Sequence, residues 1–184
     1  MTTPREAFVN KLASGLEERR SDELLRTLEL PAGIDFTSND YLGFCADSQL
    51  RESIAKTIQN HGTGSGASRL LRGNHLVHVE AEKALAEFSG RSAALLFSSG
   101  FAANLGLFSA LAGKDDVLFS DSLNHASIID GMRLSKAKRV VYAHQDFQDL
   151  QKQIESTPCK GQRFIVTESV FSMDGDISNL PELV

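Results

Sequence analysis

The segment Ser98-Ser99-Gly100 ends an apolar run, and helix-forming residues follow it without a linker. This break predicts a strand over residues 93–98 that leads directly into a helix over residues 101–112. The first N–H groups of a helix have no acceptor within the helix, and glycine leaves space for an oxygen-rich anion to approach them. The turn is therefore a candidate phosphate site, although an ordinary strand-to-helix connection can have the same residues.

A second candidate is His125, which lies between a predicted strand over 116–120 and a predicted helix over 126–136. A flat imidazole at this position could stack on a planar ring or hydrogen-bond a carboxylate. The alternative is that Asn124 or Ser122 caps the helix and that His125 only occupies its first turn. The residue types leave both interpretations open.

The third candidate segment, residues 167–176, supplies hydroxyls and carboxylates after a predicted strand over 163–168. Loops that follow buried strands often carry binding and catalytic residues. The run Asp174-Gly175-Asp176 is also typical of a simple turn. The segment is thus a candidate site whose carboxylates have a purely structural alternative.

Helices and strands alternate regularly in the second half of the chain. We expect helices over 75–89, 101–112, 126–136 and 146–156, and strands over 93–98, 116–120, 139–143 and 163–168. This alternation predicts an α/β fold with a parallel sheet covered by helices. Ligands of such sheets collect beyond the carboxyl ends of the strands, so the three candidate segments should lie side by side at one edge.

The N-terminal part of the chain is less regular. Apolar residues at helical spacing predict a helix over 4–28, followed by a brief strand and a tight loop over 31–44, and a helix over 48–60. Three glycines then alternate with small residues over 62–68, where the backbone must adopt unusual angles or approach another group closely. We expect an N-terminal segment over 1–47 and the first part of a larger domain over 48–184.

Composition excludes several classes of protein. The 184 residues are 41% hydrophobic and 23% charged, with a net charge of −5, which is typical of a globular chain and argues against a nucleic-acid surface. Two distant cysteines, Cys45 and Cys159, indicate neither a disulfide framework nor a zinc site. No apolar run approaches the ~20 residues of a membrane helix, and the N-terminus does not have the pattern of a secretory signal. We therefore expect a cytoplasmic protein that binds neither membrane nor nucleic acid.

Five motifs in order along the chain resemble the α-oxoamine synthases, pyridoxal-phosphate (PLP) enzymes of the fold-type I aminotransferase class. The motifs are SNDYLG (38–43), GSGASR (64–69), SGFAAN (99–104), NHAS (124–127) and VFSMDG (170–175). The resemblance implies an α/β PLP-transferase fold, here incomplete, preceded by the N-terminal helix and short strand.

The resemblance also implies roles for individual residues. Gly100 and Phe101 would hold PLP at the start of a helix, His125 would stack on its pyridine ring, and Ser172 would lie near its phenolic oxygen. Arg26 aligns with a position that helps to bind the acyl-thioester substrate, and Asn39 with one near the amino-acid carboxylate.

The chemistry that the resemblance implies is a decarboxylative condensation of an amino acid with an acyl thioester, with PLP as the electron sink. Gly100 and Ala102 favour the branch that condenses L-alanine with pimeloyl-CoA, or its carrier-protein form, to 8-amino-7-oxononanoate in biotin biosynthesis. The run from Leu123 to Gly131 fits 2-amino-3-ketobutyrate CoA ligase equally well, so this branch is the alternative. Serine palmitoyltransferase and 5-aminolevulinate synthase share the chemistry.

The family's Schiff-base lysine and ring-nitrogen aspartate are expected beyond Val184, so we interpret the chain as an N-terminal fragment that is inactive alone and leaves apolar faces and sheet edges uncovered. Lys136 lies in a Ser-Lys-Ala context that superficially matches the cofactor lysine, but it falls at the end of a predicted helix, where cations are favoured by the helix dipole. The family further implies a homodimer. Two alternatives remain: a non-catalytic partner subunit without the lysine, and a simple phosphate-binding module.

Overall fold

The computed structural model describes residues 3–30 and 32–183. The chain divides into two compact units, Met1–Gly64 and Ser65–Val184, and each is described by itself. The expected division after residue 47 stays a prediction about the complete protein.

The first unit contains helices α1 (Pro4–Ser21) and α2 (Ser48–His61), with a short 3-10 turn η1 (Phe44–Ala46) between them. A capping box begins α1, since the Glu6 N–H donates to Thr3 Oγ1 (3.3 Å) and the Glu6 carboxylate accepts from the Thr3 N–H (2.7 Å). The helix ends well before the predicted residue 28, because Glu23 adopts a left-handed backbone with φ 58°.

The brief strand expected within 31–44 is not formed in residues 32–44, and Pro31 lies outside the described residues. Local side-chain bonds satisfy this backbone instead. Asp35 Oδ1 accepts from the Thr37 N–H (2.7 Å), and Ser38 Oγ accepts from the Asp40 N–H (3.0 Å). Such turns compete with strand pairing, which explains why the expectation was wrong.

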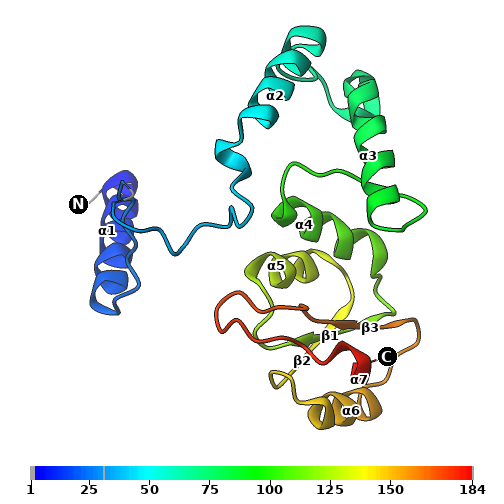
Figure 1. Cartoon of the computed structure of the whole chain (residues 1–184). Coiled ribbons are helices and arrows are strands. Elements are labelled where there is room, and N and C mark those ends of the chain that lie inside the picture. Colours follow the sequence, from blue (N-terminus) through cyan, green and yellow to red (C-terminus); the bar gives the residue numbers. More distant parts are fainter. Residues whose placement is uncertain (1–2, 31, 184) are drawn as a thin grey trace. The chain divides into compact units, whose positions relative to one another are not determined.

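From α4 onward the second unit carries the alternation of helices and strands that the sequence predicts (Figure 1). Its elements are η2 (Arg69–Gly73), α3 (Leu76–Phe88), α4 (Gly100–Leu111), β1 (Val117–Asp121), α5 (Ala126–Leu134), β2 (Lys138–Tyr142), α6 (Phe147–Ser156), β3 (Arg163–Val166) and α7 (Leu180–Leu183).

The three strands form a parallel sheet in the order β2-β1-β3. Val117 at the start of β1 is level with Lys138 of β2 and with Arg163 of β3. Helices α4 and α5 cover one face of the sheet and α6 covers the other (Figure 1). The central strand β1 is therefore buried on both faces, as its apolar sequence requires.

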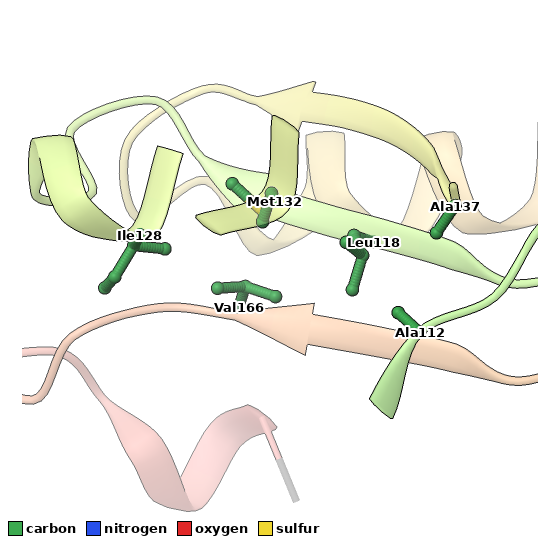
Figure 2. Close-up of a cluster of buried hydrophobic side chains, with 6 residues drawn as sticks. All are labelled: Ala112, Leu118, Ile128, Met132, Ala137 and Val166. Carbon is green, nitrogen blue, oxygen red and sulfur yellow. The ribbon is translucent and has the colours of Figure 1, made fainter. Parts of the chain in front are cut away.

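Side chains of β1 alternate between two apolar clusters. Leu118 points toward α5 and packs in the cluster shown in Figure 2, which contains Ala112, Leu118, Ile128, Met132, Ala137 and Val166. Val117 and Phe119 point to the other face, where they meet Tyr142 and Leu150. This two-sided core fixes where β1 ends, and the candidate site begins at that end.

The strand expected over 93–98 is absent, although its backbone is extended near Ser99 (φ −161°, ψ 161°). A strand needs a neighbour, and in the described residues the outer edges of β2 and β3 carry no further strand. The N–H of Leu96 donates to Glu82 Oε1 (2.8 Å) instead of to a strand, and Leu95 is 67% exposed. The expectation was wrong because the segment pairs with neither of these outer edges and its Leu96 N–H binds the Glu82 carboxylate instead.

Large apolar side chains remain exposed in both units, as expected; they include Leu28, Phe36, Leu70, Phe88 and Met173. A cavity of about 310 Å³ lies between α4 and β3 and is lined by apolar and neutral side chains. Within the described residues, no helix combines the length and the apolar character needed to cross a membrane.

Candidate active site at the carboxyl edge of the sheet

The first turn of α4 leaves two backbone donors free. Ser99 caps the helix, since its Oγ accepts from the Ala102 N–H (3.1 Å). The N–H groups of Gly100 and Phe101 have no acceptor in the described part of the chain. A Cβ placed on Gly100 would meet nothing within 4 Å, so the space beside this residue is open. The geometry suits an anion such as a phosphate.

His125 caps α5 itself, which neither sequence interpretation anticipated. Its Nδ1 accepts from the Ser127 N–H (3.1 Å) and contacts Ser127 Oγ (2.7 Å). Ser127 Oγ in turn accepts from Asn104 Nδ2 of α4 (2.8 Å). Because Nδ1 is an acceptor here, the neutral ring carries its proton on Nε2. The exposed ring thus presents its faces and an Nε2–H donor outward, and two hydrogen bonds connect it to α4.

The loops after β1 and β3 are joined by direct bonds. The buried Asn124 donates from Nδ2 to the carbonyl oxygen of Val166 (2.8 Å) and to Ser120 Oγ (3.0 Å). The backbone N–H of His125 donates to the carboxylate of Glu168. Asn124 therefore connects β1 to β3 through these two hydrogen bonds and does not cap α5.

Ser172 lies in a hairpin that we call the Ser172 hairpin, residues 170–177. The Phe171 N–H donates to the Asp176 carbonyl (3.0 Å), and the Gly175 N–H donates to the Phe171 carbonyl (2.8 Å). Gly175 has φ 73°, which favours glycine at this turn. Phe171 is buried and anchors the hairpin, whereas Ser172 is exposed.

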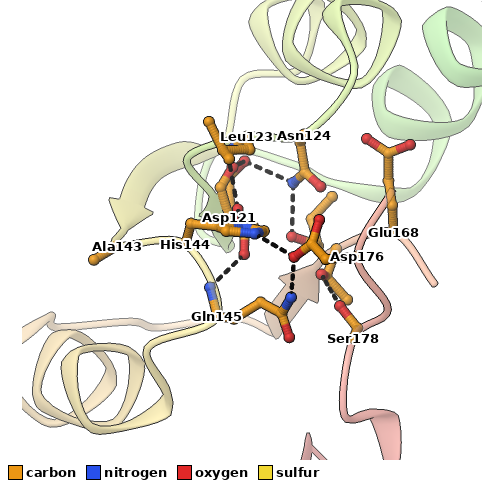
Figure 3. Close-up of polar contacts among 12 residues, drawn as sticks. Asp121, Leu123, Asn124, Ala143, His144, Gln145, Glu168, Asp176 and Ser178 are labelled. Atoms are coloured by element: carbon orange, nitrogen blue, oxygen red, sulfur yellow. Dashed lines mark hydrogen bonds and ion pairs between the residues drawn. The ribbon is translucent and has the colours of Figure 1, made fainter. Parts of the chain in front are cut away.

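The sequence analysis missed a cluster of three ionisable side chains at the same edge (Figure 3). His144 Nδ1 lies 2.8 Å from Asp121 Oδ1, and Nε2 lies 2.7 Å from Asp176 Oδ2. Hydrogen bonding to Asp121, together with Asp176, raises the pKa of His144 above its usual 6.5. The same contact with His144 lowers the pKa of Asp176.

A signal for His144 was present in the sequence. The residue follows the predicted strand 139–143, so it lies at the carboxyl end of a strand like the three segments that were considered. Applying the same rule to this fourth strand end would have found it. Asp176 was considered as one carboxylate of the third candidate segment or as a turn residue, but not as a partner of His144.

Arg26 and Asn39 both lie in exposed loops of the first unit. The remaining predicted residues, Gly100, Phe101, His125 and Ser172, belong to the second unit. The structure links His125 to α4 and to the loop after β3, and it links the Ser172 hairpin to β1 through His144. The functional roles of all six residues stay predictions.

Comparisons with known proteins identify the family. The profile described as aminotransferase class I and II matches residues 31–184. An 8-amino-7-oxononanoate synthase of Lysinibacillus sphaericus is 49% identical over 149 residues, covering 81% of this chain and 38% of the relative. An 8-amino-7-oxononanoate synthase 2 of Bacillus subtilis strain 168 is 50% identical with the same coverage. Three others match over 46–49% of their length, so the chain spans about half or less of these relatives.

Solved structures agree with this assignment. A serine palmitoyltransferase from S. paucimobilis with a bound PLP–myriocin aldimine superposes with a TM-score of 0.83 at 29% identity, covering 96% of this chain and 50% of that chain. The 8-amino-7-oxononanoate synthase of Francisella tularensis gives a TM-score of 0.67 at 38% identity, covering 82% and 41%. The expected α/β PLP-transferase fold is confirmed, and so is PLP as the cofactor of the family.

Proposed function

We propose, from the premise that this chain belongs to the aminotransferase class I and II family, that the complete protein is a PLP-dependent acyltransferase. It condenses L-alanine with pimeloyl-CoA, or with the pimeloyl group on a carrier protein, and forms 8-amino-7-oxononanoate for biotin biosynthesis. The observation that carries the proposal is the identity of 49–50% to relatives named for this reaction, over 81% of the chain.

The residues of the second unit fit PLP. The unpaired N–H groups of Gly100 and Phe101 can bind its phosphate, and the absence of a side chain at Gly100 leaves that approach open. The exposed ring of His125 can lie against the pyridine ring, and the exposed Ser172 hydroxyl can hydrogen-bond its phenolic oxygen. When bound, PLP supplies the electron sink that makes loss of CO2 from an amino acid feasible.

His125 has a second role in this proposal. Ser127 holds Nδ1 as an acceptor, so the ring is fixed in orientation and Nε2 keeps its proton. That N–H can donate to a carboxylate oxygen of the amino acid and orient it. The bond from the His125 backbone to Glu168 holds the loop at the same place.

We propose further that Arg26 binds the acyl thioester and that Asn39 binds the amino-acid carboxylate. We also propose that the complete protein is a cytoplasmic homodimer.

The experiment is a product assay on the complete protein expressed from its whole gene. PLP-loaded enzyme is incubated with L-alanine and pimeloyl-CoA, and 8-amino-7-oxononanoate is measured by mass spectrometry. His125→Ala should lower the rate by at least about tenfold, because it removes the ring and the Nε2–H donor. An unchanged rate and an unchanged cofactor spectrum in this variant would show that the role of His125 is wrong.

A second candidate function comes from the solved structures, of which several are serine palmitoyltransferases, one at 38% identity over 78% of this chain. Parallel assays with L-serine and palmitoyl-CoA test it, and assays with glycine and acetyl-CoA test the 2-amino-3-ketobutyrate CoA ligase alternative. Faster turnover of either pair than of L-alanine with pimeloyl-CoA would replace the proposed substrates.

A further inference from the structure

The imidazole of His144 is engaged by carboxylates on both sides. Asp121 comes from the end of β1 and Asp176 from the Ser172 hairpin, and both contacts are at 2.8 Å or less. Carboxylates accept hydrogen bonds, so the ring satisfies both only when both nitrogens carry protons. The ring also meets the buried Phe171 edge to face, with centroids 4.5 Å apart.

The two carboxylates belong to segments that carry candidate site residues. Asp121 Oδ1 also accepts from the Leu123 N–H (2.9 Å), and its side chain is 1% exposed, so it is a fixed point for the loop 122–125 that ends in His125. Asp176 lies in the hairpin that presents Ser172. Figure 3 shows His144 between these carboxylates. In the described residues, the hydrogen bonds of His144 with Asp121 and Asp176 therefore join the hairpin to the end of β1.

We propose that His144 is a positioning residue, which in its doubly protonated form holds the Ser172 hairpin against the loop that carries His125. The proposal rests on the proposed function only in taking Ser172 and His125 as cofactor contacts. His144 itself touches neither of them in the described contacts, so it acts through Asp121 and Asp176.

The contact of His144 with Asp121 and Asp176 is expected to depend on pH. The ionisable groups that face the ring are Asp121 from β1 and Asp176 from the hairpin, while its other neighbours, Gln145 and Phe171, are uncharged. Asp149 of α6 binds the Ala143 N–H next to it (2.9 Å). The pKa of His144 is raised above its ordinary value of 6.5 in the folded chain. The stabilisation of the hairpin by the doubly protonated ring is therefore fully present below pH 6.5, and it is lost as pH rises through the folded pKa.

Gln145 provides a second connection that does not titrate. Its backbone N–H donates to Asp121 Oδ2 (3.0 Å), and its side-chain amide donates to Asp176 Oδ2. A purely structural contact of this kind would hold the hairpin equally at all pH values. The pH profile therefore separates the contribution of the His144 ring from that of Gln145.

The test is hydrogen exchange on the whole 184-residue chain. Exchange of the Phe171 and Gly175 amides, which close the hairpin, is followed across the titration of the ring and expressed relative to the Phe119 amide in β1. In the unmodified chain, hairpin exchange should increase in a step as His144 loses its second proton. In His144→Gln, exchange should be faster by at least about tenfold at low pH, and the step should vanish. The matched control is His61→Gln, which replaces an exposed histidine of the first unit. It should leave the rate of hairpin exchange and its step with pH unchanged.

Two results would overturn the proposal: hairpin exchange that is equal in His144→Gln and the unmodified chain, or a step that persists in the variant. If His144→Gln fails to fold, as judged by loss of Phe119 protection, Asp176→Asn replaces it. That variant keeps the shape of the hairpin residue and removes its charge, so the step should move to lower pH. An unmoved step would also overturn the proposal.

A PLP titration of the same proteins keeps the two proposals separate. If the unmodified chain binds PLP, His144→Gln should weaken binding about tenfold while His61→Gln does not. Equal PLP affinity of His144→Gln and the unmodified chain would show that His144 does not position the cofactor contacts. If the unmodified chain binds PLP no better than inorganic phosphate, the cofactor site proposed for this chain fails, while the exchange result still decides whether His144 holds the hairpin.

Discussion

The contact between α4 and α5 can be tested by the substitution Gly131→Ala. A Cβ at this position would lie 2.4 Å from the carbonyl oxygen of Asn104 and 2.9 Å from Cδ2 of Phe108. The closest of these atoms is backbone, so α4 and α5 must separate to admit a methyl group. Overpacking of this kind costs about 1–3 kcal/mol, whereas alanine in a helix interior is about 1 kcal/mol more favourable than glycine.

The matched control is Gly106→Ala in α4. A Cβ there would meet only the ring of Phe97, at 3.2 Å from Cε1, and this side chain is 44% exposed and free to move. Both variants gain the same helix propensity, so their difference isolates the overlap at Gly131, about 1–3 kcal/mol. Thermal unfolding should place Gly131→Ala about 2–12 °C below Gly106→Ala. Equal midpoints would refute the close approach of the two helices.

Three further predictions concern two buried residues and one partly exposed ion pair. Phe119→Ala removes a side chain that is 0% exposed in the core of the sheet and should lower the free energy of unfolding in urea by about 3–5 kcal/mol; a loss below about 1 kcal/mol would contradict the two-sided core. Asn124→Ala leaves a buried carbonyl of β3 without its donor and should cost about 1–3 kcal/mol in the same assay, which an unchanged urea midpoint would disprove. The guanidinium of Arg69, with the Leu96 N–H, lowers the pKa of Glu82 from 4.5 to about 2. The stability that Glu82 contributes is therefore present above pH 4.5 and is lost as pH falls toward 2. The difference in unfolding free energy between the unmodified chain and Glu82→Gln should shrink over that interval. A difference that stays constant with pH would refute the ion pair.

Strand β1 and helix α5 of the second unit could be predicted because each one buries a regular apolar pattern. The central strand was expected over 116–120 and is Val117–Asp121, and the helix expected over 126–136 is Ala126–Leu134. The small differences lie at the ends, where local bonds decide. At the end of α5, Ser135 Oγ donates to the Met132 carbonyl (2.9 Å) and Ser135 adopts an extended backbone.

The segment 93–98 shows what an apolar pattern cannot predict. Its residues have the composition of a buried strand, but a strand forms only when another strand offers its N–H and C=O groups. In this chain the Leu96 N–H finds the Glu82 carboxylate instead, and that carboxylate is held by Arg69 at 2.6 Å. Pairing is a property of the whole sheet, so the amino-acid types of one segment do not determine it.

The site was predictable in outline and not in its connections. The rule that ligands collect at the carboxyl ends of parallel strands located His125 and the Ser172 hairpin correctly at that edge. It could not show that His125 would cap its own helix through Ser127, because Asn124 and Ser122 are the more common capping residues. Nor could it pair His144 with Asp176, which lies 32 positions away and meets it only through the fold.

Strand β1 connects stability with site geometry, and this affects how variants should be interpreted. Phe119 is buried in the core, and two residues later Asp121 holds His144, Gln145 and the backbone of Leu123. A cavity beneath β1 would shift this carboxylate, and the Ser172 hairpin would move with it through His144. Loss of PLP binding in Phe119→Ala would therefore follow from displacement of Asp121 and would say nothing of a direct contact. A direct role for His125 requires a variant that weakens PLP binding while Phe119 keeps its protection from exchange.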